Sequence, residues 1–596
     1  MEALLKQHFG HDAFRPMQRQ IVQDVVAGRD VFVLMPTGGG KSLCYQLPSL
    51  MVDGVTVVVS PLIALMQDQV KALEACGVRA TFLNSSVDPS ENARRQAAAV
   101  RGEYDLIYMA PERLASGAGL AFVRKLRLAR LAIDEAHCIS EWGHDFRPEY
   151  RQIGQLRQMF AHVPVIALTA TATPRVQQDI IEQLHLRDPA VYRGQFERRN
   201  LHYEVRPKSR TFEQILTYLR KHPHDEGIIY CQSRAGVDRL AARLVEHGIA
   251  ALPYHAGLDN AVRTHNQHDF VYGSTRVMVA TIAFGMGIDK PDVRFVIHAD
   301  LPRNLEGYYQ ETGRAGRDGL DSDCILFYSP GDRARVEYFI EQKTDERERQ
   351  LGYEQLDQVC AYATTTLCRC IPLLKHFGEE HPGNCGHCDN CRNPAELHDA
   401  TQDARKLLSA IARTGQRYGL GYIIDVLRGS QAERVLQNRH HELSVHGIGR
   451  DRNRTYWQHV AQKLLDSGQL RMTTDEYRVV QFTPESLPVL RGEVEIRIAA
   501  PPTPLRQRDR HDRIAPSDGP FDPMLFERLR RLRQQIAREE GVPPYVVFTD
   551  VTLRELSRHQ PTTREAFAAI PGVGQHKLAK YSARFLKAIE EYRAIG

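Results

Sequence analysis

The stretch Met35–Ser42, Met-Pro-Thr-Gly-Gly-Gly-Lys-Ser, combines the residue types that bind phosphate groups. Glycines let backbone N–H groups approach an anion closely, a lysine adds positive charge, and a serine hydroxyl can ligate Mg²⁺. A plain glycine turn is the alternative, since Met35 stands where the usual pattern has its first glycine. The apolar run Asp30–Leu34 and the helical pattern Leu43–Leu47 on either side favour a phosphate site. The candidate ligands are Thr37, Gly38, Gly39, Gly40, Lys41 and Ser42.

Two adjacent carboxylates, Asp134 and Glu135, follow the apolar segment Leu128–Ile133. Such pairs are common and are usually only solvated. In a chain that also has a phosphate loop, they match the needs of phosphoanhydride hydrolysis. Asp134 can hold a Mg²⁺ ion that Ser42 also ligates, and Glu135 can orient the attacking water. The combination predicts a nucleotide-hydrolysing site.

Two arginines, Arg314 and Arg317, stand three residues apart in the segment Tyr309–Asp318. On a helix this spacing places both side chains on one face. If that face meets the phosphate loop across a cleft, the guanidinium groups can neutralise charge on a transferring phosphoryl group. The alternative is a pair of surface arginines that bind neighbouring carboxylates.

Aromatic and basic side chains gather in the segment Cys138–Tyr150, directly after the carboxylate pair. Trp142 and Phe146 offer faces on which unpaired bases can stack, and Arg147 adds a cation. An isolated Trp–Phe pair more often fills a core. The position next to the carboxylates favours a loop that links base stacking to hydrolysis.

A glutamine, Gln18, precedes the phosphate loop near the N-terminus. A glutamine amide can pair with both the donor and the acceptor on an adenine edge. We therefore take Gln18 as a candidate adenine-binding residue. A helix cap or a surface amide is the alternative interpretation.

Five of the 11 cysteines crowd between residues 368 and 391. The run Cys385–Cys391, Cys-Gly-His-Cys-Asp-Asn-Cys, has the spacing of a zinc site, and Cys368 or Cys370 can supply the fourth thiolate. A redox-active disulfide is the alternative. Four thiolates leave no open coordination position, so a structural Zn²⁺ ion is predicted. The histidine within the run, His387, is expected to be exposed.

A chain of 596 residues is too long for one hydrophobic core, and three to five domains are expected. The net charge of +5 permits an anionic partner without requiring one. No apolar run approaches the ~20 residues of a membrane span, and the N-terminus lacks a signal-peptide pattern. These two features, together with the scattered positions of the remaining cysteines, indicate a protein of the reducing cytosol.

Short apolar runs that end in loops predict two halves built on parallel sheets, the second starting near Phe196. Open sheets of this kind bind ligands at the carboxyl ends of their strands, where the candidate loops lie. The second half has no Gly-Lys-Ser loop of its own. The runs that contain the predicted strands are 30–34, 55–62, 106–113, 128–133 and 165–172, then 227–234, 276–289 and 295–298.

The last third of the chain is predicted to contain two smaller domains. Helical patterns and a hairpin around Thr474-Asp475 indicate a winged helix, a fold that lays a helix on duplex DNA. The basic run His446–Arg454 could follow phosphates. A Pro-, Arg- and Asp-rich linker and a small helical domain follow. The predicted winged-helix elements are helices 404–412, 421–427 and 455–466 and strands 469–472 and 477–480, and the helical domain covers 522–592.

Several motifs together resemble a superfamily-2 helicase motor. They are Thr-Gly-Gly-Gly-Lys-Ser, Asp-Glu-Ala-His, Thr-Ala-Thr-Ala, Phe-Gly-Met-Gly-Ile-Asp and Gln-Glu-Thr-Gly-Arg-Ala-Gly-Arg. The phrases Phe-Arg-Pro-x-Gln and Cys-Ile-Ser-x-Trp-Gly-His-Asp-Phe-Arg-Pro-Glu-Tyr narrow the resemblance to the RecQ DNA helicases, and it runs essentially end to end. RecQ proteins often carry an aromatic residue directly after a Phe-Gly pair, where this chain has His11 after Phe9-Gly10.

The resemblance implies an α/β multidomain fold. Two RecA-like parallel-sheet lobes would be followed by a helical zinc-binding domain, a winged helix and a small all-α HRDC domain. The implied boundaries are 1–196 for the ATP-binding lobe 1, 197–330 for lobe 2, 331–397 for the zinc-binding domain, 398–497 for the winged helix, 498–520 for a linker and 521–596 for the HRDC domain.

The resemblance also implies an activity: an ATP- and Mg²⁺-dependent helicase that moves 3′→5′ on single-stranded DNA and unwinds duplex DNA in recombination, repair and replication, including the SOS response. An RNA helicase and a nucleotide-gated DNA-binding repair platform are the alternatives. Single-strand-binding protein and other repair proteins are candidate partners, with no membrane. A monomer in the bacterial cytoplasm, at the nucleoid, is expected.

The resemblance implies roles for particular residues. It selects Cys368, which stands at a fixed distance before Phe377-Gly-Glu379, as the fourth zinc ligand with Cys385, Cys388 and Cys391. It places Arg15 beside Gln18 in the nucleotide site. For Tyr545 of the HRDC domain, base stacking and packing remain equal alternatives. The catalytic set is Lys41, Asp134, Glu135, Gln310, Arg314 and Arg317, and the DNA-coupling set is His137, Trp142, Phe146, Arg147 and Tyr545.

Overall fold

The structure is a computed structural model that describes residues 1–84, 87–141, 146–285, 290–394, 397–473, 479–499 and 521–595. The chain divides into two compact units. The first contains residues 1–329 and 370–382 and the described part of 514–596, and the second contains 330–369 and the described part of 383–513. The segment 370–382 therefore groups with the lobes, inside the range 331–397 that the resemblance assigns to the zinc-binding domain.

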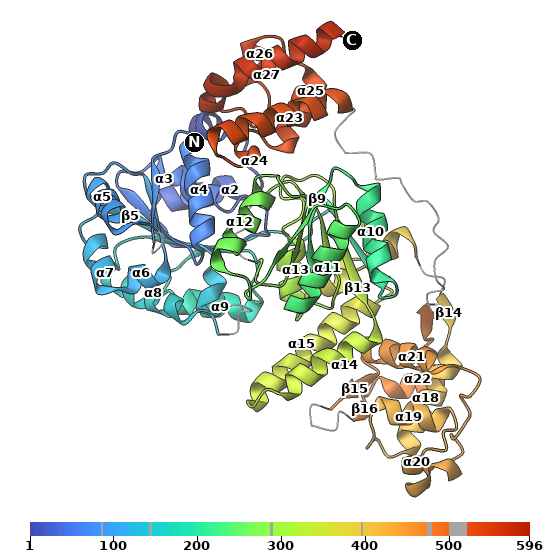
Figure 1. The fold of residues 1–596 in the computed structure, drawn as a ribbon. Helices are drawn as coiled ribbons and strands as arrows, with labels where there is room; N and C mark the ends of the chain where they lie inside the picture. Colours follow the sequence, from blue (N-terminus) through green and yellow to red (C-terminus); the bar gives the residue numbers. More distant parts are fainter. Residues whose placement is uncertain are drawn as a thin grey trace. The chain divides into compact units, whose positions relative to one another are not determined.

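Lobe 1 is built on a seven-stranded parallel sheet with the strand order β3-β4-β2-β5-β6-β1-β7. Every residue of β1 and β2 is buried, as expected for parallel strands whose two faces are covered. Figure 1 shows the helices of this lobe, in blue and cyan, packed around the strands. The strands are β1 Val31–Leu34, β2 Val55–Val59, β3 Ala80–Leu83, β4 Leu106–Met109, β5 Leu128–Ile133, β6 Val165–Thr169 and β7 Ala190–Arg193.

The lobe 1 helices connect these strands and position the phosphate loop. Helix α3 begins directly after the loop, and η2 follows the carboxylate pair. The helices are α1 Glu2–Leu4, η1 Leu5–Phe9, α2 Gln18–Val26, α3 Leu43–Ser49, α4 Ile63–Ala75, α5 Pro89–Val100, α6 Pro111–Ala115, α7 Gly117–Val123, η2 Ala136–Ile139, α8 Pro148–Met159 and α9 Pro174–Gln183.

Lobe 2 repeats the plan on a six-stranded parallel sheet with the order β10-β11-β9-β12-β13-β8. The two parallel sheets confirm the predicted fold class. The strands are β8 Leu201–Pro207, β9 Glu226–Tyr230, β10 Ala251–Tyr254, β11 Val277–Ala280, β12 Val293–His298 and β13 Ser322–Tyr328, and the helices are α10 Thr211–Lys221, α11 Arg234–Glu246, α12 Asn260–Val271 and α13 Leu305–Thr312. Residues 286–289 of the Phe-Gly-Met-Gly-Ile-Asp motif lie outside the described part of the chain.

The C-terminal helical domain has its own apolar core, which includes Leu529, Phe548, Phe567 and Phe585. Helix α27 packs on η1 of lobe 1, where the Gly572 N–H donates to the Gly10 carbonyl at 3.0 Å. The helices are α23 Pro523–Glu540, α24 Pro544–Val547, α25 Asp550–His559, α26 Arg564–Ala568 and α27 Gln575–Ile595.

A buried network of opposite charges joins lobe 2 to the C-terminal helical domain. Lys290 pairs with Glu226 at 2.8 Å and with Asp292 at 3.0 Å. Burial alone would lower the pKa of Lys290, but Asp292 and Glu226 hold it above its usual value. Four acidic and four basic side chains take part: Glu226, Asp292, Asp318 and Asp550 with Lys290, Arg294, Arg530 and Arg533.

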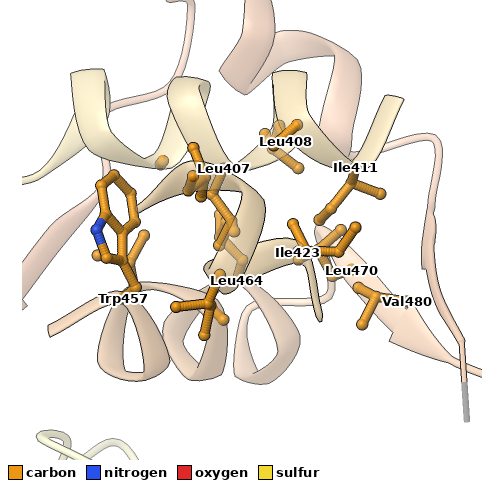
Figure 2. Close-up of a cluster of buried hydrophobic side chains, with 14 of the residues drawn as sticks. Leu407, Leu408, Ile411, Ile423, Trp457, Leu464, Leu470 and Val480 are labelled. Atoms are coloured by element: carbon orange, nitrogen blue, oxygen red, sulfur yellow. The ribbon is translucent and has the colours of Figure 1, made fainter. Parts of the chain in front are cut away.

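The second unit contains two long helices, short zinc-site elements and the winged helix. Figure 2 shows the winged-helix core, where Leu407, Ile411, Trp457 and Leu464 point toward one another from neighbouring helices. The elements of this region are α14 Pro330–Glu341, α15 Glu346–Thr364, α17 Asp389–Arg392, β14 Leu397–Asp399, α18 Thr401–Arg413, α19 Leu420–Leu427, α20 Glu433–Gln437, η3 His440–Glu442, α21 Arg454–Asp466, β15 Leu470–Met472, β16 Val480–Phe482, α22 Ser486–Arg491 and β17 Arg497–Ala499, while α16 Cys370–Lys375 belongs to the first unit.

The winged-helix elements lie close to the predicted ranges, with one correction. In the described residues the second hairpin strand covers Val480–Phe482 and so extends past the predicted end at residue 480, because Leu470 pairs with Phe482 and Met472 with Val480. This register turns Leu470 and Val480 into the core, so burial decides the pairing. The predicted turn Thr474-Asp475, with Tyr477 and Arg478, lies outside the described residues.

Candidate nucleotide and zinc sites

The phosphate loop lies between β1 and α3, at the carboxyl edge of the lobe 1 sheet. It is tied to the sheet because the Met35 N–H donates to the Thr169 carbonyl at 3.1 Å. Lys41 Nζ donates to the carbonyl oxygens of Met35 at 3.0 Å and Pro36 at 3.3 Å. The ammonium group is thus held over the loop, where a phosphate bound by the backbone would meet it.

Two glycines of the loop adopt backbone conformations that side chains disfavour. Gly38 has φ +79° and Gly40 has φ +82°. A Cβ on Gly40 would collide with the Gln18 amide, and one on Gly39 would lie 2.9 Å from the Pro36 carbonyl. The loop therefore needs glycine for both its turn and its packing.

The Gln18 amide is buried and faces the phosphate loop. Its Oε1 accepts from the Arg15 N–H at 2.9 Å, and its Nε2 donates to the Gly40 carbonyl at 3.1 Å. Arg15 donates in turn to the Gly38 carbonyl. Both residues thus stand beside the loop, as predicted for a nucleotide site, and their role toward adenine stays a prediction.

The carboxylate pair follows β5, on the strand beside β6 and two places from β1. Glu135 has φ +47°, an uncommon left-handed conformation for a residue with a side chain. Asp134 Oδ1 accepts from the Glu135 N–H at 3.0 Å and holds this turn. His137 is fully buried, with Nδ1 2.8 Å from Thr169 Oγ1 and 3.3 Å from Glu135 Oε2. It links the carboxylate loop to the Thr-Ala-Thr loop.

Tyr45 is influenced by both Ser42 and Asp134. Burial raises the pKa of Tyr45 well above its usual value; the Asp134 charge raises it further, and a hydrogen bond to the Ser42 side chain opposes the rise. A hydroxyl and a carboxylate oxygen are the hard ligands that Mg²⁺ prefers. The two side chains have the chemistry for a magnesium ion, and their role as Mg²⁺ ligands stays a prediction.

The two arginines of the Tyr309–Asp318 segment do not lie on a helix, which corrects the prediction of a shared helix face. Helix α13 ends at Thr312, and Arg314 and Arg317 follow in a turn. Arg314 is buried beside Tyr230; burial raises the pKa of Tyr230 to about 12, and the Arg314 charge opposes that rise. Gln310 is half-buried near the end of α13.

This arginine turn touches the phosphate loop. A Cβ on Gly38 would lie 3.2 Å from Arg317 Cα, and a Cβ on Gly313 would lie 2.5 Å from Thr37 Oγ1. The two loops are therefore packed backbone to backbone. Sequence reasoning required such an approach but could not show it, because the loops are far apart in the chain.

The aromatic loop is described only in part, since Trp142 lies outside the described residues. Phe146 is half-buried, with the Arg151 guanidinium 5.1 Å from its ring centre. Arg147 donates to the Pro61 carbonyl at 3.0 Å. Sequence reasoning missed Tyr150, a fully buried residue whose hydroxyl donates to the Asp134 carbonyl at 3.1 Å and so links this loop to the carboxylates. Tyr545 is half-buried in the C-terminal domain, and its role stays a prediction.

The four predicted zinc ligands converge in the second unit. The Sγ atoms of Cys368, Cys385, Cys388 and Cys391 all lie within 4.8 Å of one another. Tetrahedral Zn–S bonds of about 2.3 Å would place the sulfurs about 3.8 Å apart, so the set fits Zn²⁺.

Hydrogen bonds around the thiols hold the cluster together. Arg369 forms a two-pronged ion pair with Asp389, which stands between two of the ligands, and also donates to the Tyr362 carbonyl at 2.9 Å. Asn390 Nδ2 donates to the Thr365 carbonyl at 2.8 Å. His387 is buried, which corrects the expectation of an exposed side chain.

Among the described residues, no helix combines the length and apolar character needed to cross a membrane.

Five family models match successive parts of the chain. They are the DEAD/DEAH box helicase at 15–180, the helicase conserved C-terminal domain at 208–319, the RecQ zinc-binding model at 330–392, the RQC domain at 394–507 and the HRDC domain at 522–589.

Curated relatives match over nearly the whole chain. The ATP-dependent DNA helicase RecQ of Haemophilus influenzae is 41% identical over 100% of this chain and 96% of its own length. The protein of the same name from Pasteurella multocida is 42% identical over 98% of this chain and 93% of its own length. The protein of the same name from Bacillus subtilis is 40% identical over 99% of this chain and 98% of its own length.

Proposed function

This chain belongs to the RecQ family and is an ATP-dependent DNA helicase, and we propose that it moves 3′→5′ along single-stranded DNA. Opening duplex DNA costs about 1.4 kcal/mol per base step, whereas non-covalent affinity saturates near about 18–21 kcal/mol. Binding alone would thus be exhausted after roughly 15 steps, by the same two figures. A repeated cycle of ATP hydrolysis removes this limit. The direction of travel rests on the family.

The packing of the phosphate loop against the arginine turn carries the assignment of the hydrolytic site. The loop would hold the triphosphate with its backbone and Lys41, with Gln18 and Arg15 beside the base. Arg314 and Arg317, with Gln310, would stabilise negative charge on the phosphoryl group during transfer. The support is the close approach of the two loops, since a Cβ on Gly38 would lie 3.2 Å from Arg317 Cα and one on Gly313 would lie 2.5 Å from Thr37 Oγ1.

The carboxylate pair would divide the remaining work. Asp134 and Ser42 would hold Mg²⁺, which neutralises phosphate charge and polarises the phosphoryl group when bound. Glu135, fixed in its left-handed turn, would orient the attacking water. Four cysteines bind Zn²⁺ as a structural ion, because four thiolates leave no coordination position open to substrate.

DNA bound at the aromatic loop would influence the hydrolytic site through the position of this loop. Phe146 and Arg147 would receive the single strand, and Tyr150 and His137 would pass the loop's position to the carboxylates. We place the activity in recombination, repair and replication in a bacterial cytoplasm, with a monomer acting at the nucleoid. Single-strand-binding protein is a candidate partner.

The substitution Lys41→Ala tests the hydrolytic site. Loss of the loop cation should lower the DNA-stimulated kcat for ATP at least 100-fold, because charge that develops on the phosphates loses its nearest ammonium group. Lys125→Ala, at an exposed lobe 1 position, is the control and should keep the parental rate. Parental ATP hydrolysis by Lys41→Ala would show that the site lies elsewhere.

Unwinding of 3′-tailed but not 5′-tailed duplexes would support the direction of travel, and the reverse preference would contradict it.

A further inference from the structure

One guanidinium group bridges the two loops of the nucleotide site. Arg198 lies in the connection between β7 and β8, away from every motif singled out in the sequence. Its Nη1 donates to the carbonyl of Thr37 in the phosphate loop. Its Nη2 donates to the carbonyls of Ala315 at 3.2 Å and Gly316 at 2.8 Å, both in the arginine turn. A single side chain therefore holds both lobes.

The side chain is itself held in place. Arg198 Nε donates to Asn200 Oδ1 at 3.3 Å. Asn200 Nδ2 then donates to the carbonyls of Gly316 and Leu320, both at 2.9 Å. The connection, the arginine turn and the start of β13 thus form one hydrogen-bonded assembly. A Cβ on Gly38 would lie 3.4 Å from Arg198 Nη1, so the guanidinium also lies directly against the phosphate loop.

The charge of Arg198 is only partly compensated. Burial lowers the pKa of Arg198 and the Arg317 charge lowers it further, although Tyr309 and Tyr203 oppose the change. Partial desolvation likewise lowers the pKa of Arg15, and Arg198 adds to that effect. Carbonyl oxygens satisfy the donors of Arg198 without cancelling its charge. An anion such as a triphosphate would relieve the repulsion among these cations.

We propose that Arg198 is a positioning residue that latches the arginine turn to the phosphate loop and so sets the approach of Arg314 and Arg317 to the phosphates. The proposal rests on the nucleotide site described above. Because it acts through the turn, Arg198 contributes to kcat more than to ATP binding. The contact uses two separate nitrogens of the guanidinium group, Nη1 for the phosphate loop and Nη2 for the arginine turn, whereas a lysine ammonium group has one nitrogen.

Three substitutions test the latch in the full-length protein. Arg198→Ala should lower the DNA-stimulated kcat about 10-fold or more, with KM for ATP changed less than about threefold. Arg198→Lys should resemble Arg198→Ala rather than the parent. Arg199→Ala is the matched control, because Arg199 is the next residue, is 84% exposed and pairs only with Glu197 among the ion pairs of the described residues. The kcat of Arg199→Ala should stay within about twofold of the parental kcat.

A double-mutant cycle with Arg317→Ala separates positioning from a general structural role. If Arg198 acts through the turn, Arg198→Ala should lower kcat by a smaller factor in the Arg317→Ala background than in the parent, since Arg314 is then the one arginine left to position. The proposal would be overturned if the fold-loss of kcat in the double variant equalled the product of the two single losses. It would also be overturned if Arg198→Lys restored the parental kcat, or if Arg198→Ala left kcat unchanged. A failure of the nucleotide site itself would show separately, as parental activity in Lys41→Ala.

Discussion

Two groups of basic side chains in this protein differ in what they face. In the network between lobe 2 and the C-terminal helical domain, each cation has a carboxylate within 4.0 Å. Around the phosphate loop, Arg15 and Arg198 instead donate to backbone carbonyls. The matched charges hold two domains together. The cations at the loop keep a net positive charge, which fits a site that receives an anion.

Arg314→Ala should break the nucleotide site with the largest effect. Removal of an arginine that stabilises the transferring phosphoryl group lowers kcat about 10³-fold. Steady-state hydrolysis of ATP with single-stranded DNA measures this loss. Thermal unfolding should change little, because Arg314 balances no carboxylate partner among the ion pairs of the described residues. Near-parental kcat with a large loss of stability would place Arg314 with the structural cations.

Arg533→Met should show the opposite behaviour. Arg533 pairs with Asp550 at 2.9 Å and donates to the Phe548 carbonyl at 2.9 Å. Without Arg533, Asp550 keeps the more distant Arg294 at 3.5 Å. Breaking a buried pair costs about 3 kcal/mol. Hydrogen exchange should therefore quicken in α23 and α25. The exposed neighbour Arg531→Met is the control, and equal exchange in the two variants would contradict a structural role.

A non-hydrolysable ATP analogue should distinguish the two groups without mutation. At about 100 times its Kd, a ligand adds about 2.7 kcal/mol to the stability of the state that binds it. Protection from hydrogen exchange should rise at the phosphate loop and α3. Helices α23 and α25 should gain less, since their charges are already paired. An equal rise in protection at the phosphate loop and at helices α23 and α25 would contradict this distinction between the two groups of charges.

Arg584→Ala should have the smallest effect. Arg584 pairs with Glu539 at 2.5 Å, but both side chains are exposed. Exposed pairs contribute about 0.2–1 kcal/mol, because water screens them and both side chains lose freedom. Thermal unfolding of the full chain should shift by no more than a degree or two. A loss as large as that of Arg533→Met would show that burial does not separate the two classes.

Local patterns predicted the phosphate loop and its flanking elements well. The run Asp30–Leu34 contains β1, and α3 begins at Leu43 as expected. Such runs are legible because buried parallel strands need consecutive apolar residues. The strands β3, β7, β8, β10 and β13 lie outside the predicted runs. Three of them, β3, β7 and β10, are only four residues long, and β7 alternates half-buried with exposed residues.

The site predictions failed where burial or a turn was decided by distant neighbours. His387 is buried although it stands between polar ligand residues. Arg314 and Arg317 follow a helix that ends at Thr312, so helical spacing does not describe them. Arg198 gave no signal, because its partners are 161 and 117 residues away in the chain.

The sequence by itself determined the predicted chemistry of this protein: which stretch has the residues to bind phosphate, which carboxylates follow a strand, and which cysteines have the spacing of a zinc site. These features depend on residue type and short spacing, which are properties of the chain alone. The tertiary structure decided which groups meet. It brings Gly38 against Arg317 and places Arg198 between them, because two separately formed sheets present their loops to each other.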